Sequence, residues 1–232
     1  MGVTVAIHGF LGEARDWDFL RQAGFDIRAV DLFRTYPLPM LAAAADAIVG
    51  YSMGGRLALQ ALLSGATFSR AVIVSAGLGI DDPAERIARR QRDELWAQRF
   101  ERDDWPELMH DWNAQPLFDG EGVPREESDF DRRALAAALR EWSPVVLPPV
   151  AARLHEIEIP LLWIAGARDA KYVAEGKRAV ELLPNAELWV CPDAGHRVMW
   201  DQPQRFVERM RKFLGVSKVF HHRGTEDTEK DG

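Results

Sequence analysis

The chain has 232 residues, of which 47% are hydrophobic and 28% are charged, as is typical of a globular protein with one larger domain. Its net charge of −7 argues against a nucleic-acid binder, so cations must be gathered locally if the chain binds an anion. The single cysteine, Cys191, excludes an intrachain disulfide framework and fits a reducing compartment. Because neither a signal-peptide pattern nor a membrane-spanning apolar run is found, we expect a cytoplasmic protein.

Short apolar runs alternate with helical patterns in the first third of the chain. Each run is rich in β-branched residues and bounded by glycine or polar residues, which is typical of buried strands. The sequence predicts four such strands, at residues 3–7, 25–31, 47–51 and 71–76. An alanine-rich helix is expected at residues 39–46, and a second helix begins after residue 52 and stops at Ser64 and Gly65.

The pattern changes at about residue 80. Between residues 81 and 142 no strand-like run occurs, charge density rises, and tryptophans are spaced along helical stretches. After residue 158 the alternation returns, and it predicts two strands and two helices, at residues 160–166, 187–191, 171–183 and 202–214. Residues 216–232 are polar and acidic and predict a disordered tail, whose adjacent His221 and His222 we do not interpret as a metal site.

This order of elements predicts an α/β fold. Strand–helix alternation on both sides of a helical insert indicates a mostly parallel, doubly wound sheet with a cap between two of its strands. We expect the core to comprise residues 1–78 and 149–215, and the helical cap to comprise residues 79–148.

The most informative stretch lies at residues 47–59, where an apolar strand, a serine and an apolar helix follow one another. Gly50, Ser52 and Gly54 form the G-x-S-x-G pattern of a nucleophile elbow. A turn that raises the serine hydroxyl above the sheet strains its backbone, and side chains at the two glycines would collide with neighbouring elements. The following helix directs its positive end at the serine. A chance occurrence of the pattern is the alternative.

A glycine-bracketed loop with the sequence His-Gly-Phe-Leu-Gly, residues 8–12, follows the first predicted strand. Beside the elbow, this loop could direct the backbone N–H of Phe10 at the serine. Together with the N–H of Met53 it would form an oxyanion hole. We interpret His8 as a structural histidine that is hydrogen-bonded in a turn.

Two later loops carry the base and the orienting carboxylate that a serine nucleophile needs. Asp169 follows one predicted strand directly, and His196 follows the next. Because the carboxyl ends of parallel strands meet at one edge of the sheet, Ser52, Asp169 and His196 should converge as a catalytic triad. Taken singly, Asp169 could be a helix N-cap and His196 a loop histidine bonded to backbone.

The core resembles the α/β-hydrolase superfamily over about residues 3–215, and the insert resembles the cap of the MenH family within it. Members of that family are 2-succinyl-6-hydroxy-2,4-cyclohexadiene-1-carboxylate synthases of menaquinone biosynthesis. The resemblance rests on four motifs, E-R-x-x-R-R at residues 85–90, D-W-x-x-Q-P-L-F at 111–118, the loop at 8–12 and Gly-x-Arg-Asp at 166–169.

The resemblance implies a lyase that needs no cofactor or metal ion and eliminates pyruvate from 2-succinyl-5-enolpyruvyl-6-hydroxy-3-cyclohexene-1-carboxylate. The triad would assist proton abstraction without an acyl-enzyme, and the oxyanion hole would stabilise the charge on the adjacent carbonyl. A small substrate with several carboxylates requires clustered arginine, so Arg56 and Arg89 would bind it together with Trp112. The alternatives are a surface salt bridge for Arg56 and a solvated helix face for the arginines of residues 86–92.

The chain departs from the family pattern at several positions. Asn113 stands where tyrosine is common, Arg197 stands where asparagine is common, and the link before the elbow strand lacks the usual Gly-His-Gly. A further cap arginine has no clean match, and Arg132 or Arg133 could substitute for it by position. Two rival functions stay open: a serine esterase or thioesterase that forms an acyl-enzyme on a small acidic substrate, and a non-catalytic ligand-binding protein.

Overall fold

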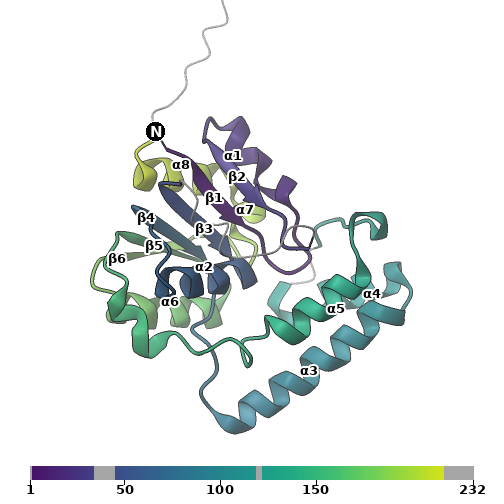
Figure 1. Ribbon diagram of the computed structural model, residues 1–232. Helices are drawn as coiled ribbons and strands as arrows, with labels where there is room; N and C mark the ends of the chain where they lie inside the picture. Colours follow the sequence, from purple (N-terminus) through teal and green to yellow (C-terminus); the bar gives the residue numbers. More distant parts are fainter. Residues whose placement is uncertain (1, 34–44, 119–121, 217–232) are drawn as a thin grey trace, which may run out of the picture.

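The computed structural model describes residues 2–33, 45–118 and 122–216 of the chain. Its described strands form one parallel sheet in the order β2-β1-β3-β4-β5-β6 (Figure 1). The strands are β1 (Thr4–Ile7), β2 (Ile27–Val30), β3 (Ala47–Tyr51), β4 (Arg70–Val74), β5 (Leu161–Gly166) and β6 (Ala186–Cys191). Every strand predicted from the sequence is present, and the parallel pairing confirms the predicted α/β class.

Helices cover both faces of this sheet. Alternate residues of each central strand face opposite layers, because successive side chains of a strand point to opposite faces. Ile48 and Ile73 belong to the apolar cluster on one face, and Val49 and Val72 to the cluster on the other. The first cluster includes residues of α2 (Met53–Leu63) and α6 (Ala170–Leu182), and the second those of α1 (Asp18–Gln22), α7 (Val198–Asp201) and α8 (Pro203–Leu214).

Two helix predictions at the end of the core agree with α6 and α8 to within one residue at each boundary. The predicted helix at residues 39–46 and the predicted tail at 216–232 lie almost entirely outside the described residues. Short 3-10 turns complete the core and the insert, at Ala14–Trp17, Pro116–Phe118, Glu127–Asp129 and Ala151–Glu156. Within the described ranges, no helix combines the length and apolar character needed to cross a bilayer.

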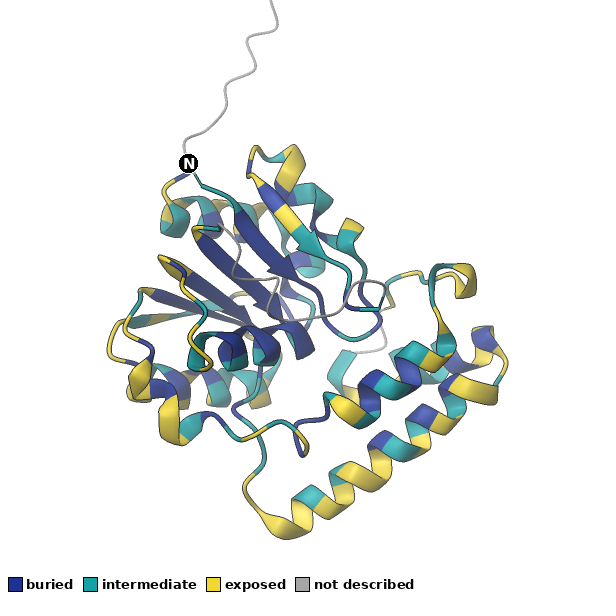
Figure 2. Ribbon diagram, viewed as in Figure 1, coloured by how far each residue is buried: buried dark blue, intermediate teal, exposed yellow. Residues whose placement is uncertain are grey.

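A layer of helices, here called the helical layer, lies between β4 and β5 in the chain. It contains α3 (Pro83–Arg102), α4 (Trp105–Asn113) and α5 (Arg132–Glu141), and α3 and α5 run side by side (Figure 1). Asp82 caps α3 by accepting the backbone N–H of Glu85 at 2.7 Å, and a proline in the first turn fixes its start. Most of α3 is exposed (Figure 2).

The helical layer has an apolar cluster of its own. Phe100, Leu108 and Leu135 are fully buried in it, and Leu11, from the loop after β1, joins the same cluster. The layer is therefore anchored to the core at the loop that follows β1. The boundaries 79–148 of a separate cap domain stay a prediction.

Candidate active site

Ser52 occupies the turn between β3 and α2. Its φ of 52° lies in the left-handed region that residues other than glycine rarely adopt. A Cβ added to Gly50 would lie 2.4 Å from the carbonyl oxygen of Gly54. One added to Gly54 would lie 2.4 Å from the carbonyl oxygens of Ile7 and His8. The strained serine and the two positions that admit only glycine are thus as the sequence predicted.

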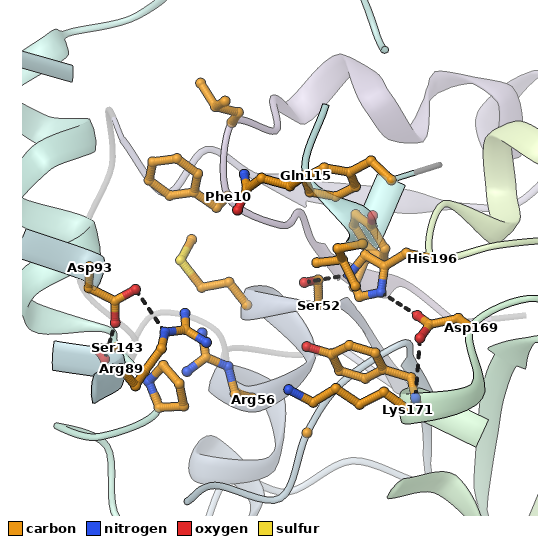
Figure 3. Close-up of a pocket in the computed structure, with 18 of the residues that line it drawn as sticks. Phe10, Ser52, Arg56, Arg89, Asp93, Gln115, Ser143, Asp169, Lys171 and His196 are labelled. Atoms are coloured by element: carbon orange, nitrogen blue, oxygen red, sulfur yellow. Dashed lines mark hydrogen bonds and ion pairs between the residues drawn. The ribbon is translucent and has the colours of Figure 1, made fainter. Parts of the chain in front are cut away.

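His196 joins Ser52 to Asp169 at the carboxyl edge of the sheet (Figure 3). Its Nδ1 lies 2.7 Å from Asp169 Oδ2, and its Nε2 lies 3.1 Å from Ser52 Oγ. Asp169 Oδ1 accepts the backbone N–H of Tyr172 at 3.3 Å, and so caps α6. The same carboxylate therefore caps a helix and contacts the imidazole, so the helix-cap interpretation of Asp169 does not exclude the catalytic one. The structure brings all three predicted residues into one chain of hydrogen bonds.

Burial sets the charge of the imidazole. His196 is only 2% exposed, and desolvation lowers its pKa, although the hydrogen bond to Asp169 acts in the opposite direction. The imidazole is therefore neutral at pH 7. The carboxylate of Asp169 accepts the Nδ1–H, which leaves the lone pair of Nε2 facing the hydroxyl of Ser52. This is the protonation state that a general base requires.

The loop after β1 passes close to the elbow. A Cβ at Gly9 would lie 3.4 Å from the Cβ of Ser52 and 2.9 Å from the ring of Tyr51. Phe10 and Met53 line the cavity described below, and in the described part of the chain neither of their backbone N–H groups has a hydrogen-bond partner. That these two N–H groups form the predicted oxyanion hole stays a prediction.

His8 has a structural place in the same loop. Its ring is 1% exposed, its Nδ1–H donates to the carbonyl of Gly9 at 2.7 Å, and its Nε2 accepts the N–H of Leu32 at 3.0 Å. Both ring nitrogens are used by backbone groups. The interpretation of His8 as a hydrogen-bonded structural histidine is confirmed.

A cavity of about 780 Å³ lies above the triad, between the edge of the sheet and the helical layer. Ser52 and His196 line it from the core, and residues of α3 and α4 line it from the helical layer. Cationic side chains outnumber acidic ones around the cavity, although the whole chain has a net charge of −7.

Two arginines meet in this cavity. Arg56, one turn beyond Ser52, lies beside Arg89 of α3 (Figure 3). Burial, and after it the charge of Arg89, lower the pKa of Arg56 to about 10. Its buried Nη1 has no hydrogen-bond partner among the described residues, so the predicted alternative of a surface salt bridge is wrong. Arg89 Nε donates to Asp93 at 2.8 Å, and Ser143 donates to the second oxygen of that carboxylate at 2.5 Å. One carboxylate against two guanidinium groups leaves a positive site that fits an anion.

Trp112 also lines the cavity, within an aromatic cluster. Its ring centroid lies 4.9 Å from those of Phe10 and Trp96 and 5.4 Å from that of Phe100. Phe10 thus contacts the helical layer with its side chain. The tryptophan connects the predicted oxyanion loop to the helical layer.

The suggestion that Arg132 or Arg133 enters the cavity is wrong. Both residues lie in the first turn of α5, away from the cavity. The Arg132 guanidinium donates to the carbonyl of Phe100 at 2.6 Å and pairs with Glu127 at 2.9 Å, so it joins backbone segments within the helical layer. Arg133 is exposed.

Arg125 lines the cavity instead, and sequence reasoning gave it no role. It forms ion pairs with Asp16 at 2.8 Å and Glu13 at 3.1 Å, which join its segment to the core. Sequence reasoning also missed Asp93, although its spacing of four residues from Arg89 on a predicted helix favours an ion pair. No local pattern marked Tyr172, whose ring lies 4.6 Å from that of His196.

A model of the alpha/beta hydrolase family matches residues 4–209, and the chain therefore belongs to that family. A curated relative, the 2-succinyl-6-hydroxy-2,4-cyclohexadiene-1-carboxylate synthase of Serratia proteamaculans (strain 568), is 33% identical over 175 residues, which cover 72% of this chain and 67% of the relative. The protein of the same name from Klebsiella pneumoniae is 28% identical over 247 residues, covering 90% and 92%.

Solved structures show the same fold. MenH from S. aureus has a TM-score of 0.84 at 24% identity, covering 92% of this chain and 93% of that one. A thermophilic esterase from Thermogutta terrifontis has a TM-score of 0.67 at 16% identity, with 92% and 89% covered. Together with the curated relatives, these likenesses confirm the predicted resemblance to MenH within the α/β-hydrolase superfamily.

Proposed function

We propose that this chain is a 2-succinyl-6-hydroxy-2,4-cyclohexadiene-1-carboxylate synthase that acts in menaquinone biosynthesis without a cofactor or metal ion. Its curated relatives bear that name over most of the chain's length. The observation that carries the proposal is the pair of arginines beside the hydrogen-bonded triad, because a substrate with several carboxylates needs such a site close to the reacting carbon.

The triad supplies the base. Nε2 of His196 takes the hydroxyl proton of Ser52, and the serine oxygen removes a proton from the substrate ring. The electron pair of the broken C–H bond forms a ring double bond, and the C–O bond to the enolpyruvyl group breaks. The leaving group accepts a proton and is released as pyruvate. Asp169 holds the imidazole in its tautomer and stabilises the imidazolium while it carries the proton.

The other predicted residues bind the substrate and the charge that develops. The N–H groups of Phe10 and Met53 stabilise the negative charge on the carbonyl next to the reacting carbon. Arg56 and Arg89 bind a carboxylate, and Trp112 packs against the apolar part of the substrate. The helical layer serves as the cap that excludes water. A free, buried Cys191 fits the reducing cytoplasm, which we propose as the compartment.

The decisive experiment measures pyruvate release from the enolpyruvyl substrate, made in situ by the preceding enzyme of the pathway. Wild type, Ser52→Ala and Arg56→Ala are compared, with a short-chain nitrophenyl ester as a second substrate. The synthase assignment requires rapid release and a loss of roughly 10²-fold or more in both variants. Rapid ester turnover with negligible pyruvate release would identify an esterase. Ligand binding that survives Ser52→Ala, without turnover by wild type, would identify a binding protein.

A further inference from the structure

Two side chains that depart from the MenH pattern meet across the cavity. Arg197, directly after His196, donates from Nη2 to Oδ1 of Asn113, at the end of α4, at a distance of 2.7 Å. Nδ2 of Asn113 donates in turn to the carbonyl of Met109 at 2.8 Å. Both ends of the amide are therefore used, and its oxygen is fixed toward the guanidinium. The contact joins the core to the helical layer between residues 84 positions apart in the sequence.

The same guanidinium supports an aromatic ring above the triad. The Cζ of Arg197 lies 4.1 Å from the ring centroid of Phe118, a distance typical of a cation–π contact. The ring of Phe118 lies 5.9 Å from that of His196 and 6.1 Å from that of Trp112. Phe118 is thus held between the cation and the two rings that line the cavity.

The guanidinium of Arg197 is half-buried between the core and the helical layer. Burial lowers its pKa. In the core, Arg197 has a hydrogen bond with the Tyr51 side chain, and the charges of Asp201 and of Arg125, in the segment before α5, also act on it. A half-buried guanidinium is unfavourable unless its donors and its planar faces are occupied. Tyr51 contacts Arg197 from the core, and from the helical layer Asn113 accepts from one donor while Phe118 covers one face, so the guanidinium bridges the two parts.

The segment that Arg197 holds covers the reacting group. Gln115 belongs to this segment and extends over the cavity on the side of Ser52 away from Lys171 (Figure 3). Its side chain donates to the carbonyl of Trp112 at 2.9 Å, which makes residues 112–118 a compact turn. Displacement of this turn would admit water to the imidazole and misalign the substrate.

We propose that Arg197 and Asn113 form a latch that holds residues 112–118 closed over His196, which makes Arg197 a positioning residue for the reaction. The inference rests on the proposed function, since it assigns the latch to that active site. The latch acts through Phe118 and Trp112. It excludes water and fixes the distance from substrate to base during proton abstraction. Loss of the latch should therefore lower kcat more than it raises KM.

The test is a double-mutant cycle. Asn113→Leu removes the acceptor but keeps a side chain branched at Cγ, and Arg197→Lys keeps the charge but loses the planar fork. Each should lower kcat about tenfold or more with KM within about threefold, and the double variant should be no worse than the poorer single one. Asn113→Asp, which keeps an acceptor, should retain more activity than Asn113→Leu.

Two exposed positions away from the cavity serve as matched controls, Asn185→Leu and Arg205→Lys, and both should behave as wild type. Amide hydrogen exchange of the peptide spanning residues 105–118 gives a readout without substrate, and it should accelerate in both latch variants only. Melting temperatures identify a variant that fails to fold, in which case Asn113→Asp and Arg197→Lys carry the test.

Three results would overturn the latch: multiplicative effects in the double variant, a change confined to KM, or unchanged exchange in residues 105–118. If wild type releases no pyruvate while exchange accelerates in the latch variants, the proposed function fails and the latch stands. The two failures are thus distinguishable.

Discussion

Replacing Arg56 with methionine should make the protein more stable and much less active. The buried environment lowers the pKa of Arg56 from 12.5 to about 10. Since each pKa unit corresponds to about 1.4 kcal/mol, the charged side chain destabilises the fold at pH 7 by about 3 kcal/mol. Arg56→Met removes the charge and keeps most of the apolar stem. Allowing for lost packing, we expect a net gain of roughly 1–3 kcal/mol in the free energy of unfolding.

The gain is measurable as a melting temperature. In a domain of this size 1 kcal/mol shifts Tm by about 2–4 °C, so Arg56→Met should raise Tm by about 2–12 °C at pH 7. In the same variant, kcat/KM for pyruvate release should fall by about 10²-fold or more, because the substrate carboxylate loses its buried partner. Arg90→Met is the matched control: Arg90 is exposed on α3 outside the cavity, and both quantities should stay near wild type.

Melting temperatures measured with and without a ligand distinguish a role of Arg56 in binding from a role in folding. Succinate, used as a dicarboxylate probe, should raise the Tm of wild type, since a ligand at 100 times its Kd adds about 2.7 kcal/mol. Arg56→Met should gain nothing from succinate. A lower Tm in this variant, or an undiminished succinate response, would show that Arg56 supports the fold instead of the ligand, and would refute the reasoning.

Three further predictions concern the groups around the triad. Because burial lowers the pKa of His196 below 6.5, the acid limb of the kcat/KM profile should lie below that pH. Lys171→Gln removes a charge that lowers this pKa and should move the acid limb to higher pH, and a shift the other way would contradict the reasoning. Gly54→Ala places a Cβ 2.4 Å from two carbonyl oxygens and should reduce kcat/KM by about 10²-fold, whereas Gly77→Ala, whose nearest neighbouring atom is 3.8 Å away, should be close to silent. Asp93→Asn leaves the guanidinium groups of Arg56 and Arg89 without their buried carboxylate, and should lower the Tm measured by scanning calorimetry by about 2–10 °C. An unchanged Tm would show that solvent already screens these two charges.

The sheet and the triad could be predicted because each depends on a local pattern. A fully buried strand leaves a short apolar run, and the carboxyl ends of parallel strands meet wherever those runs lie in the sequence. Ser52, Asp169 and His196 each follow such a run directly. Their convergence therefore follows from the fold class alone, without any detail of packing.

The contacts between the core and the helical layer could not be predicted in this way. Whether Arg125 or Arg132 reaches the cavity depends on how the segment before α5 crosses the core, and no periodicity records that path. Asn113 and Arg197 could be recognised singly as departures from a family pattern, yet their contact depends on the docking of α4 beside the loop that follows β6. Long-range packing of this kind leaves no signature in either segment.

The chain leaves the sheet after β4 and returns before β5 at a single narrow neck. The N–H of Val150 donates to the carbonyl of Leu78 at 2.8 Å, and Gly79, at a φ of 108°, lies so close to Pro149 that a Cβ would be 2.7 Å from its Cα. Strands β4 and β5 pair directly beneath this neck. The entropic cost of closing a loop grows only with the logarithm of its length. The pairing of β4 with β5 therefore depends little on the length of the segment between them. The segment between β4 and β5 can therefore change without moving the carboxyl edge of the sheet. A change of substrate then requires a different helical layer, while the triad stays in place.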